Sequence, residues 1–128
     1  MEIRTHKAIN QRLNGTPVKL EEGRAVIKLL TTQEMAADEK GLVHGGFIFG
    51  LADYAAMLAV NEPTVVLAQA SVKFLKPVVV GDEAIAEAEV TDVQGKKRIV
   101  KVVVKVKDVP VFEGEFLCIV PEKHVLER

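Results

Sequence analysis

The pattern of apolar and polar residues divides the chain into one long helix and a series of strands. From residue 45 to residue 60 almost every position is apolar or small, and Asn61-Glu62-Pro63 ends the run. A helix without a polar stripe is expected to be covered on all sides. Four later segments alternate between apolar and polar residues, at 64–75, 83–92, 97–107 and 111–120. A period of two predicts half-buried antiparallel strands.

Local signals assign the residues before the long helix. They predict a short helix at 5–13, a hairpin of strands at 16–20 and 24–30, and a polar loop at 31–43. Asn14-Gly15 would end the short helix, and Glu21-Glu22-Gly23 would form the hairpin turn.

The polar faces of the later strands carry complementary charges. Lys101 and Lys105 lie on the polar face of the strand at 97–107, and the strands before and after it carry glutamates. We expect these lysines to pair with glutamates on both sides, as a solvated charge ladder. Together the elements predict an α+β fold, in which a curved antiparallel sheet of five to six strands wraps one central helix. Because a sheet covers only one side of a helix, a second copy of the chain is the expected cover for the other side.

Composition narrows the class of protein. The 128 residues, of which 48% are apolar, suit one domain spanning residues 1–128. With 17 basic and 18 acidic residues, a nucleic-acid partner is not expected. The single cysteine, Cys118, fits a reducing cytoplasmic location. The N-terminal residues lack the apolar core of a signal peptide, and no apolar run reaches the roughly 20 residues that span a membrane, so no membrane association is expected.

Gly45 and Gly46 stand where the long helix should begin. A helix N-terminus presents unpaired backbone N–H groups and a partial positive charge, and glycine lets a ligand oxygen approach them. These amides could therefore form a site for an anion or an oxyanion. The alternative is that the two glycines only make a tight turn into the helix.

Asp53 is the one acidic residue in the long helix. No basic side chain lies three or four residues away, and a buried charge without a partner is costly. Asp53 is therefore expected to line a cleft, with a raised pKa, as a base or a nucleophile; the alternative is a structural carboxylate paired with a distant backbone group. Eight residues separate it from Gly45, about 12 Å along a helix, which is too far for both to act on one carbonyl. Two antiparallel helices crossing near Phe49 and Gly50 would instead place Asp53 of one copy beside Gly45 of the other.

Two motifs can be compared with known families. The first is Gly41-Leu42-Val43-His44-Gly45-Gly46, then Phe49, then Leu51-Ala52-Asp53, and the second runs from Ala70 through Phe74-Leu75-Lys76-Pro77 to Gly81-Asp82. Together they resemble the hotdog-fold acyl-CoA thioesterases, in particular the phenylacetate-degradation and hydroxybenzoyl-CoA branch. The resemblance implies a central helix wrapped by strands, two subunits joined edge to edge, and hydrolysis of an acyl-CoA. The chain differs at two positions, with Asp38 where the family often has Asn and Met57 where some members have Thr or Ser.

Further residues are predicted to contact the substrate. His44 could act as an acid or base, but we favour a role in fixing the loop before the helix. The phosphates of coenzyme A should attract basic residues at the pocket mouth, and the candidates are Lys73, Lys76, Lys96, Lys97 and Arg98, most of which we expect to be ordinary surface charges. The other predicted contacts are Phe47, Met57 and Ser71. No His/Cys cluster suggests a metal, and no cofactor is expected beyond the coenzyme A of the substrate itself.

The function that these observations favour is an acyl-CoA thioesterase that forms a homodimer, or a homotetramer of two dimers. One alternative is a non-catalytic acyl-CoA sensor on the same fold, which would not need an acid facing the thioester. A second is a hotdog hydratase or dehydratase, which would pair a catalytic His with an Asp in a different motif. The acyl group stays open at this stage.

Overall fold

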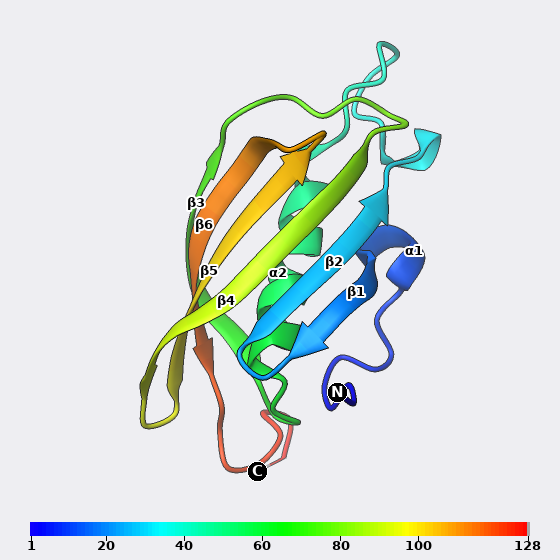
Figure 1. Cartoon of the computed structure of the whole chain (residues 1–128). Helices are drawn as coiled ribbons and strands as arrows, with labels where there is room; N and C mark the ends of the chain where they lie inside the picture. Colours follow the sequence, from blue (N-terminus) through cyan, green and yellow to red (C-terminus); the bar gives the residue numbers. More distant parts are fainter. Residues whose placement is uncertain (128) are drawn as a thin grey trace.

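The structure, a computed structural model, describes residues 1–127 and contains one long helix held by a six-stranded sheet (Figure 1). In chain order the elements are α1 (Gln11–Asn14), β1 (Thr16–Glu21), β2 (Arg24–Leu30), the 3-10 helix η1 (Gln33–Met35), α2 (Gly45–Val60), β3 (Val66–Phe74), β4 (Glu83–Gln94), β5 (Lys97–Val106) and β6 (Val109–Ile119). The predicted α+β class, the central helix and the curved antiparallel sheet are all confirmed.

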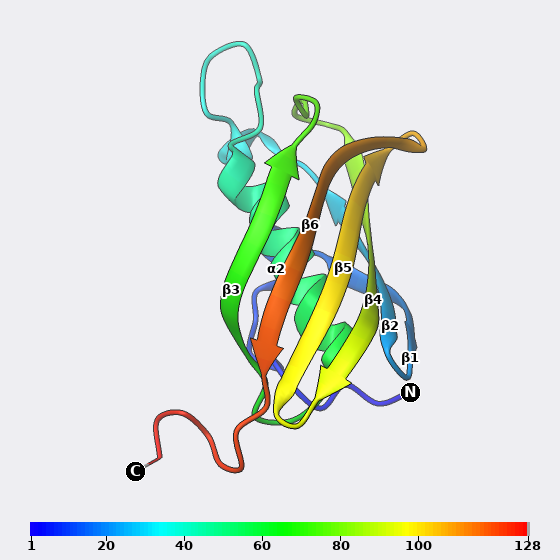
Figure 2. The same cartoon turned by 90° about the vertical axis from the view of Figure 1, so that its left-hand side faces the viewer.

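The strands follow the order β1-β2-β4-β5-β6-β3, and every neighbouring pair is antiparallel. β5 therefore lies between β4 and β6, as the alternation of lysine and glutamate strands predicted. The sheet curves around α2 without closing, so β1 and β3 are its two edges (Figures 1 and 2).

Small side chains let the sheet approach the helix closely. Alanines line the inner face of β4 and valines line that of β5, and all are fully buried. They are Ala84, Ala86, Ala88, Val100, Val102 and Val104. Because successive strand residues point to opposite faces, this regular spacing commits one whole face of each strand to the core.

The N-terminal segment differs from the prediction. Only Gln11–Asn14 is helical, where residues 5–13 were expected to be. His6 adopts a left-handed φ of 52°, which interrupts a helix, and the side chain of Asn10 caps α1 by accepting a hydrogen bond from the Arg12 N–H (3.0 Å). The segment before α1 is instead held at the C-terminal end of α2, where Asn61 accepts from the Arg4 N–H and donates to the Glu2 carbonyl, each at 2.8 Å.

The N-terminal residues, including α1, also cover part of α2, where a second copy of the chain was expected as the cover. Tyr54 and Met57 are buried within one chain, and Gln11 of α1 reaches the Tyr54 hydroxyl at 3.4 Å. Part of the side of α2 away from the sheet is therefore covered by residues of the same chain.

The loop at 31–43 sets the start of α2. The Asp38 carboxylate accepts from the N–H groups of Lys40 and Leu42 at 2.9 and 3.2 Å. The N–H of His44 then donates to the carbonyl of Met35 at 2.9 Å, and α2 begins at the next residue. Met35 is fully buried, so this loop is anchored in the core.

The expected charge ladder is present in part on the outer face of the sheet. Lys105 pairs with Glu87 at 3.2 Å. Lys101 stands between Glu89 and Glu115 in the strand register, with no ion pair within 4.0 Å among residues 1–127. Across the same range, no helix combines the length and apolar character needed to cross a membrane.

Candidate functional site

The N-terminus of α2 presents two free backbone donors. His44, in an extended conformation, precedes the helix and makes no side-chain capping hydrogen bond. Its carbonyl accepts from the N–H of Phe47 at 3.0 Å, whereas the N–H groups of Gly45 and Gly46 find no acceptor anywhere in residues 1–127. With no acidic residue in the first turn, the positive end of the helix dipole is also uncompensated.

Two aromatic rings flank this pair of donors. A Cβ atom placed on Gly45 would lie 3.1 Å from the Phe74 ring, and one on Gly46 would lie 3.0 Å from the His44 ring. A side chain at either position would therefore press on the neighbouring ring, which would have to move by a few tenths of an ångström. His44 also lies edge-on to Phe47, with 6.2 Å between ring centroids, so the ring is part of the wall beside the donors.

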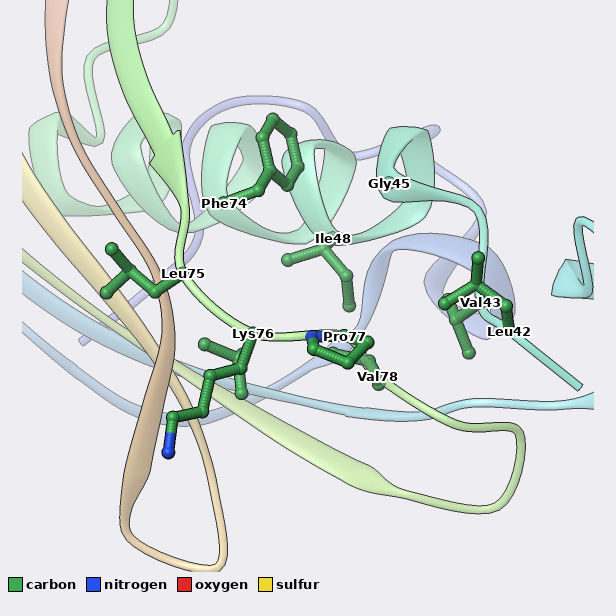
Figure 3. Close-up of a pocket in the computed structure, with 10 residues that line it drawn as sticks. Leu42, Val43, Gly45, Ile48, Phe74, Leu75, Lys76, Pro77 and Val78 are labelled. Carbon is green, nitrogen blue, oxygen red and sulfur yellow. The ribbon is translucent and has the colours of Figure 1, made fainter.

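A groove of about 300 Å³ opens beside Gly45 (Figure 3). It lies between the start of α2 and the connection from β3 to β4. Its lining is Leu42, Val43, Gly45, Ile48, Phe74, Leu75, Lys76, Pro77, Val78 and Val111. The fold therefore brings together the two motifs identified in the sequence, and Lys76 is the one charged residue among these ten.

Asp53 lies further along α2, outside this groove. Its Oδ1 atom is buried and has no hydrogen-bond partner among the described residues. Burial raises the pKa of Asp53 to about 6. Burial also raises the pKa of Cys118 to about 12, with a further contribution from the negative charge of Asp53, which therefore faces β6. An acid in this apolar setting is a stronger base than an ordinary carboxylate.

Asp53 belongs to a stripe that one chain leaves partly open. From Leu51 to Val60 every residue is buried except Asp53 and Val60. Gly46 and Phe49 continue the stripe toward the N-terminus, and neither is buried. Gly46, Phe49, Asp53 and Val60 are separated by 3, 4 and 7 residues, which places them on one side of α2.

Gly50 has a different role from the one predicted. A Cβ atom on Gly50 would lie 2.9 Å from Oδ1 of Asn14 in the same chain. The close approach at Gly50 is therefore between α1 and α2, and it says nothing about where two subunits would cross. The ring of Phe49, the other residue proposed at the crossing, packs on Phe116 with 5.6 Å between centroids.

The remaining predicted contacts do not gather at one place in the chain. Met57 is fully buried. Ser71 and Lys73 of β3 lie opposite Glu115 and Glu113 of β6 in the strand register, on the outer face of the sheet and away from α2.

The predicted basic residues are also split along the sheet. In the strand register Lys97 lies opposite Ile119, and Ile119 lies opposite Val66 at the start of β3. Gly45 lies beside Phe74 at the other end of β3, so Lys97 is far from the start of α2. Arg98 uses its guanidinium on the carbonyls of Gly95 and Lys97, and Lys96 pairs with Glu122 at 3.8 Å. Lys76 alone of the predicted cations lines the groove.

The sequence did not mark Phe74 as a site residue. Phe74 appeared as one of the inward apolar positions of its strand, and it does contact the core through Phe112 at 5.1 Å. Alternation alone cannot separate a residue that fills the core from one at a strand end that also walls a groove, because both are apolar and share a face.

Comparison with known proteins supplies the family. A model of the thioesterase superfamily matches residues 40–113, which include the start of α2, Asp53 and the end of β3. The chain belongs to the thioesterase superfamily, and its helix wrapped by an antiparallel sheet is the hotdog fold.

Two relatives contain this unit within longer chains. The chain is 60% identical over 119 residues to methylthioribose-1-phosphate isomerase of Aquifex aeolicus, covering 93% of this chain and 26% of that protein. It is 32% identical over 115 residues to the transcription factor FapR of Caldanaerobacter subterraneus, covering 89% of this chain and 58% of that protein. The chain thus spans about a quarter of the first protein and little more than half of the second.

Solved structures agree with the fold. An uncharacterized protein, PH1136 from Pyrococcus horikoshii, is 57% identical, with a TM-score of 0.98 over 99% of this chain and 98% of that one. The protein smu.793 from Streptococcus mutans, solved with bound acetyl-CoA, is 24% identical, with a TM-score of 0.82 over 93% of this chain and 97% of that one.

Proposed function

We propose that this chain is an acyl-CoA thioesterase that hydrolyses a thioester to a free acid and coenzyme A. The observation that carries the proposal is Asp53, a carboxylate with an unpartnered buried oxygen and a pKa of about 6, on the partly open stripe of an apolar helix. Leaving such a group unpaired costs stability, and a base tuned toward neutral pH is what hydrolysis requires.

The chemistry divides between two groups. Asp53 would take a proton from the attacking water, or attack the thioester carbon itself. The N–H groups of Gly45 and Gly46 would stabilise the negative charge that forms on the carbonyl oxygen. Since the two groups are about 12 Å apart along one helix, each site would use Asp53 of one subunit and the amides of its partner.

The open features of the chain support a homodimer. β3 is an edge strand, so one side of its backbone has no strand neighbour within residues 1–127. An exposed edge of nine residues favours pairing with another strand, and an identical β3 would extend the sheet. The stripe of Gly46, Phe49, Asp53 and Val60 would then face its counterpart across a twofold axis.

Relatives support an acyl-CoA as the substrate and suggest the main alternative to hydrolysis. The bound acetyl-CoA in the Streptococcus mutans protein of the same fold supports an acyl-CoA substrate. The likeness to the transcription factor FapR favours the second candidate, a binding module that senses an acyl-CoA without hydrolysing it. Both candidates use the same groove, and they differ in whether thiol is released.

The decisive experiment is a panel of acyl-CoAs assayed with a thiol-detecting reagent, alongside sedimentation to define the assembly. We expect release of coenzyme A from at least one acyl-CoA by a dimer or larger species. Tight binding without thiol release would favour the sensor, and an active monomer at micromolar concentration would refute the shared site.

A further inference from the structure

We propose that the groove beside Gly45 holds the acyl tail of the substrate and that Phe74 determines which tails fit. This inference rests on the proposed function, because the amides at the start of α2 would fix the thioester carbonyl. Gly45 and Phe74 both line the groove (Figure 3), so a carbonyl bound at these amides would direct one of its two substituents toward Phe74 and the groove.

The polarity of the groove selects the acyl arm over the pantetheine arm. Several backbone donors around it are already used, since the N–H groups of Leu75 and Lys76 both donate to the Val111 carbonyl, at 2.8 and 3.3 Å. The N–H of Gly45, which also lines the groove, has no acceptor within residues 1–127, and it is the donor that would hold the thioester carbonyl. On the opposite wall, the N–H of Val43 donates to the Val78 carbonyl at 2.8 Å. The pantetheine arm carries two amide groups, and burying them without partners would be costly. An alkyl or aryl tail carries no such cost.

The size of the groove sets a range for the tail. Its volume of about 300 Å³ holds roughly ten non-hydrogen atoms, at about 30 Å³ for each water-sized group. This corresponds to a medium-length alkyl chain or a single aromatic ring. Lys76, next to Leu75, is the one charged residue of this lining.

Phe74 is the wall residue best placed to control this size. It is the last residue of the edge strand β3, and 56% of it is exposed, unlike the buried Ile48 and Val78 of the same groove. Its ring contacts Gly45 on one side and meets Phe112 edge-on at 5.1 Å on the other. Truncating Phe74 would therefore enlarge the groove next to the reacting carbonyl while leaving the buried wall in place.

The test measures binding as well as hydrolysis. S-(2-oxoalkyl) coenzyme A thioethers keep the carbonyl and cannot be hydrolysed, and tails of about four, ten and sixteen carbons bracket the estimated capacity. Calorimetry would give the affinity of each for the parent, Phe74→Ala, Leu75→Trp and the control Val93→Ala, an exposed valine outside the groove.

Phe74→Ala should raise the affinity ratio of the longest to the shortest tail about tenfold, equivalent to burying about two more methylene groups. Leu75→Trp should act in the opposite direction and weaken the middle tail about tenfold while sparing the shortest. Val93→Ala should leave the ratio unchanged. The second variant keeps the test valid if Phe74→Ala folds poorly.

Equal weakening of all tails would assign the groove to the coenzyme A arm and overturn the inference, as would an unchanged ratio in both variants. These outcomes can be distinguished from those that test the proposed function. Length-dependent binding without hydrolysis of any acyl-CoA would keep the inference and reject the thioesterase. Hydrolysis with an unchanged length profile would do the reverse, and a parent that binds no analogue would reject both.

Discussion

The two halves of α2 offer different kinds of functional group, one from the backbone and one from a side chain. Of residues 45–50 only Ile48 is buried, and this half offers two backbone N–H groups without acceptors among the described residues, between the rings of Phe74 and His44. Residues 51–60 are almost entirely buried, and what they offer is one side chain, the Asp53 carboxylate. The first half would act through the position of its backbone N–H groups, to which glycine leaves access. The second half would act through a carboxylate whose pKa is raised by its buried surroundings.

This difference bears on how an apolar helix would carry the polar reaction that we propose. A backbone donor at a helix end costs little to leave unpaired, because solvent or a ligand can reach it. A carboxylate inside the helix is costly, and the cost appears as a pKa raised to about 6. The two halves should therefore respond differently to substitution, the second through charge and the first through space.

The largest effect should come from removing the charge in the second half. Asp53→Asn keeps the shape and hydrogen-bonding capacity of the side chain, so turnover should fall on the order of 10²–10⁴-fold, as expected for loss of a positioned base. Affinity for the substrate should change far less, and steady-state kinetics separate the two. Asp108→Asn, at an exposed turn position, is the matched control and should be silent. If Asp53→Asn turns over every substrate at the parent rate, the catalytic assignment is wrong.

Joining the two halves across subunits is tested by mixing. Gly45→Val should disable the first half, because its side chain would displace the Phe74 ring that lies 3.1 Å from the Cβ position. Each single variant should be inactive, yet in a mixed dimer one site carries both defects and the other neither. Random mixing should restore about a quarter of the parent activity, since half of the dimers would each hold one intact site. No recovery on mixing, with exchange shown by co-purification of differently tagged subunits, would place both groups in one chain.

Sequence patterns predicted the elements well where local periodicity decides the outcome. The bounds of α2 and the antiparallel strands follow from an unbroken apolar run and from alternation, which act over short stretches. The unusual setting of Asp53 was also predictable, since no basic residue stood within a helical turn of it. The sequence thus supplied the fold and the most distinctive residue of the site.

Contacts between distant residues could not be predicted in this way. The approach of Gly50 to Asn14, the contact of Phe74 with Gly45 and the anchoring of the N-terminus by Asn61 all join segments far apart in the chain. Each depends on tertiary packing, which leaves no periodic mark. For the same reason, the sequence could not show that Lys76 lines the groove while Lys97 and Arg98 lie elsewhere on the sheet. All three had been grouped together as basic candidates.

The pH dependence of stability tests the setting of the second half. The pKa of Asp53 is about 6 in the folded chain, against about 3.9 in an unfolded one, so the folded state binds more protons between these values. The free energy of unfolding should then decrease as pH rises from about 4 to about 6, by at most about 3 kcal/mol, and level off above. Denaturant unfolding of the parent and of Asp53→Asn across this range isolates the contribution. A pH profile of the difference that is flat would mean that Asp53 is solvated.

The smallest effect should come from the first half, at Gly50. Adding a methyl group there brings Cβ to 2.9 Å from Oδ1 of Asn14, while replacing a mid-helix glycine by alanine gains up to about 1 kcal/mol of helix propensity. These terms oppose each other, so Gly50→Ala alone should change the free energy of unfolding by less than about 1 kcal/mol. In an Asn14→Ala background the clash is gone and the same substitution should be stabilising by roughly 0.5–1 kcal/mol. A double-mutant cycle by chemical denaturation measures this coupling. Sedimentation should show an unchanged assembly, because Gly50 faces α1 of its own chain. A variant that folds with parent stability but fails to assemble would instead return Gly50 to the interface between subunits.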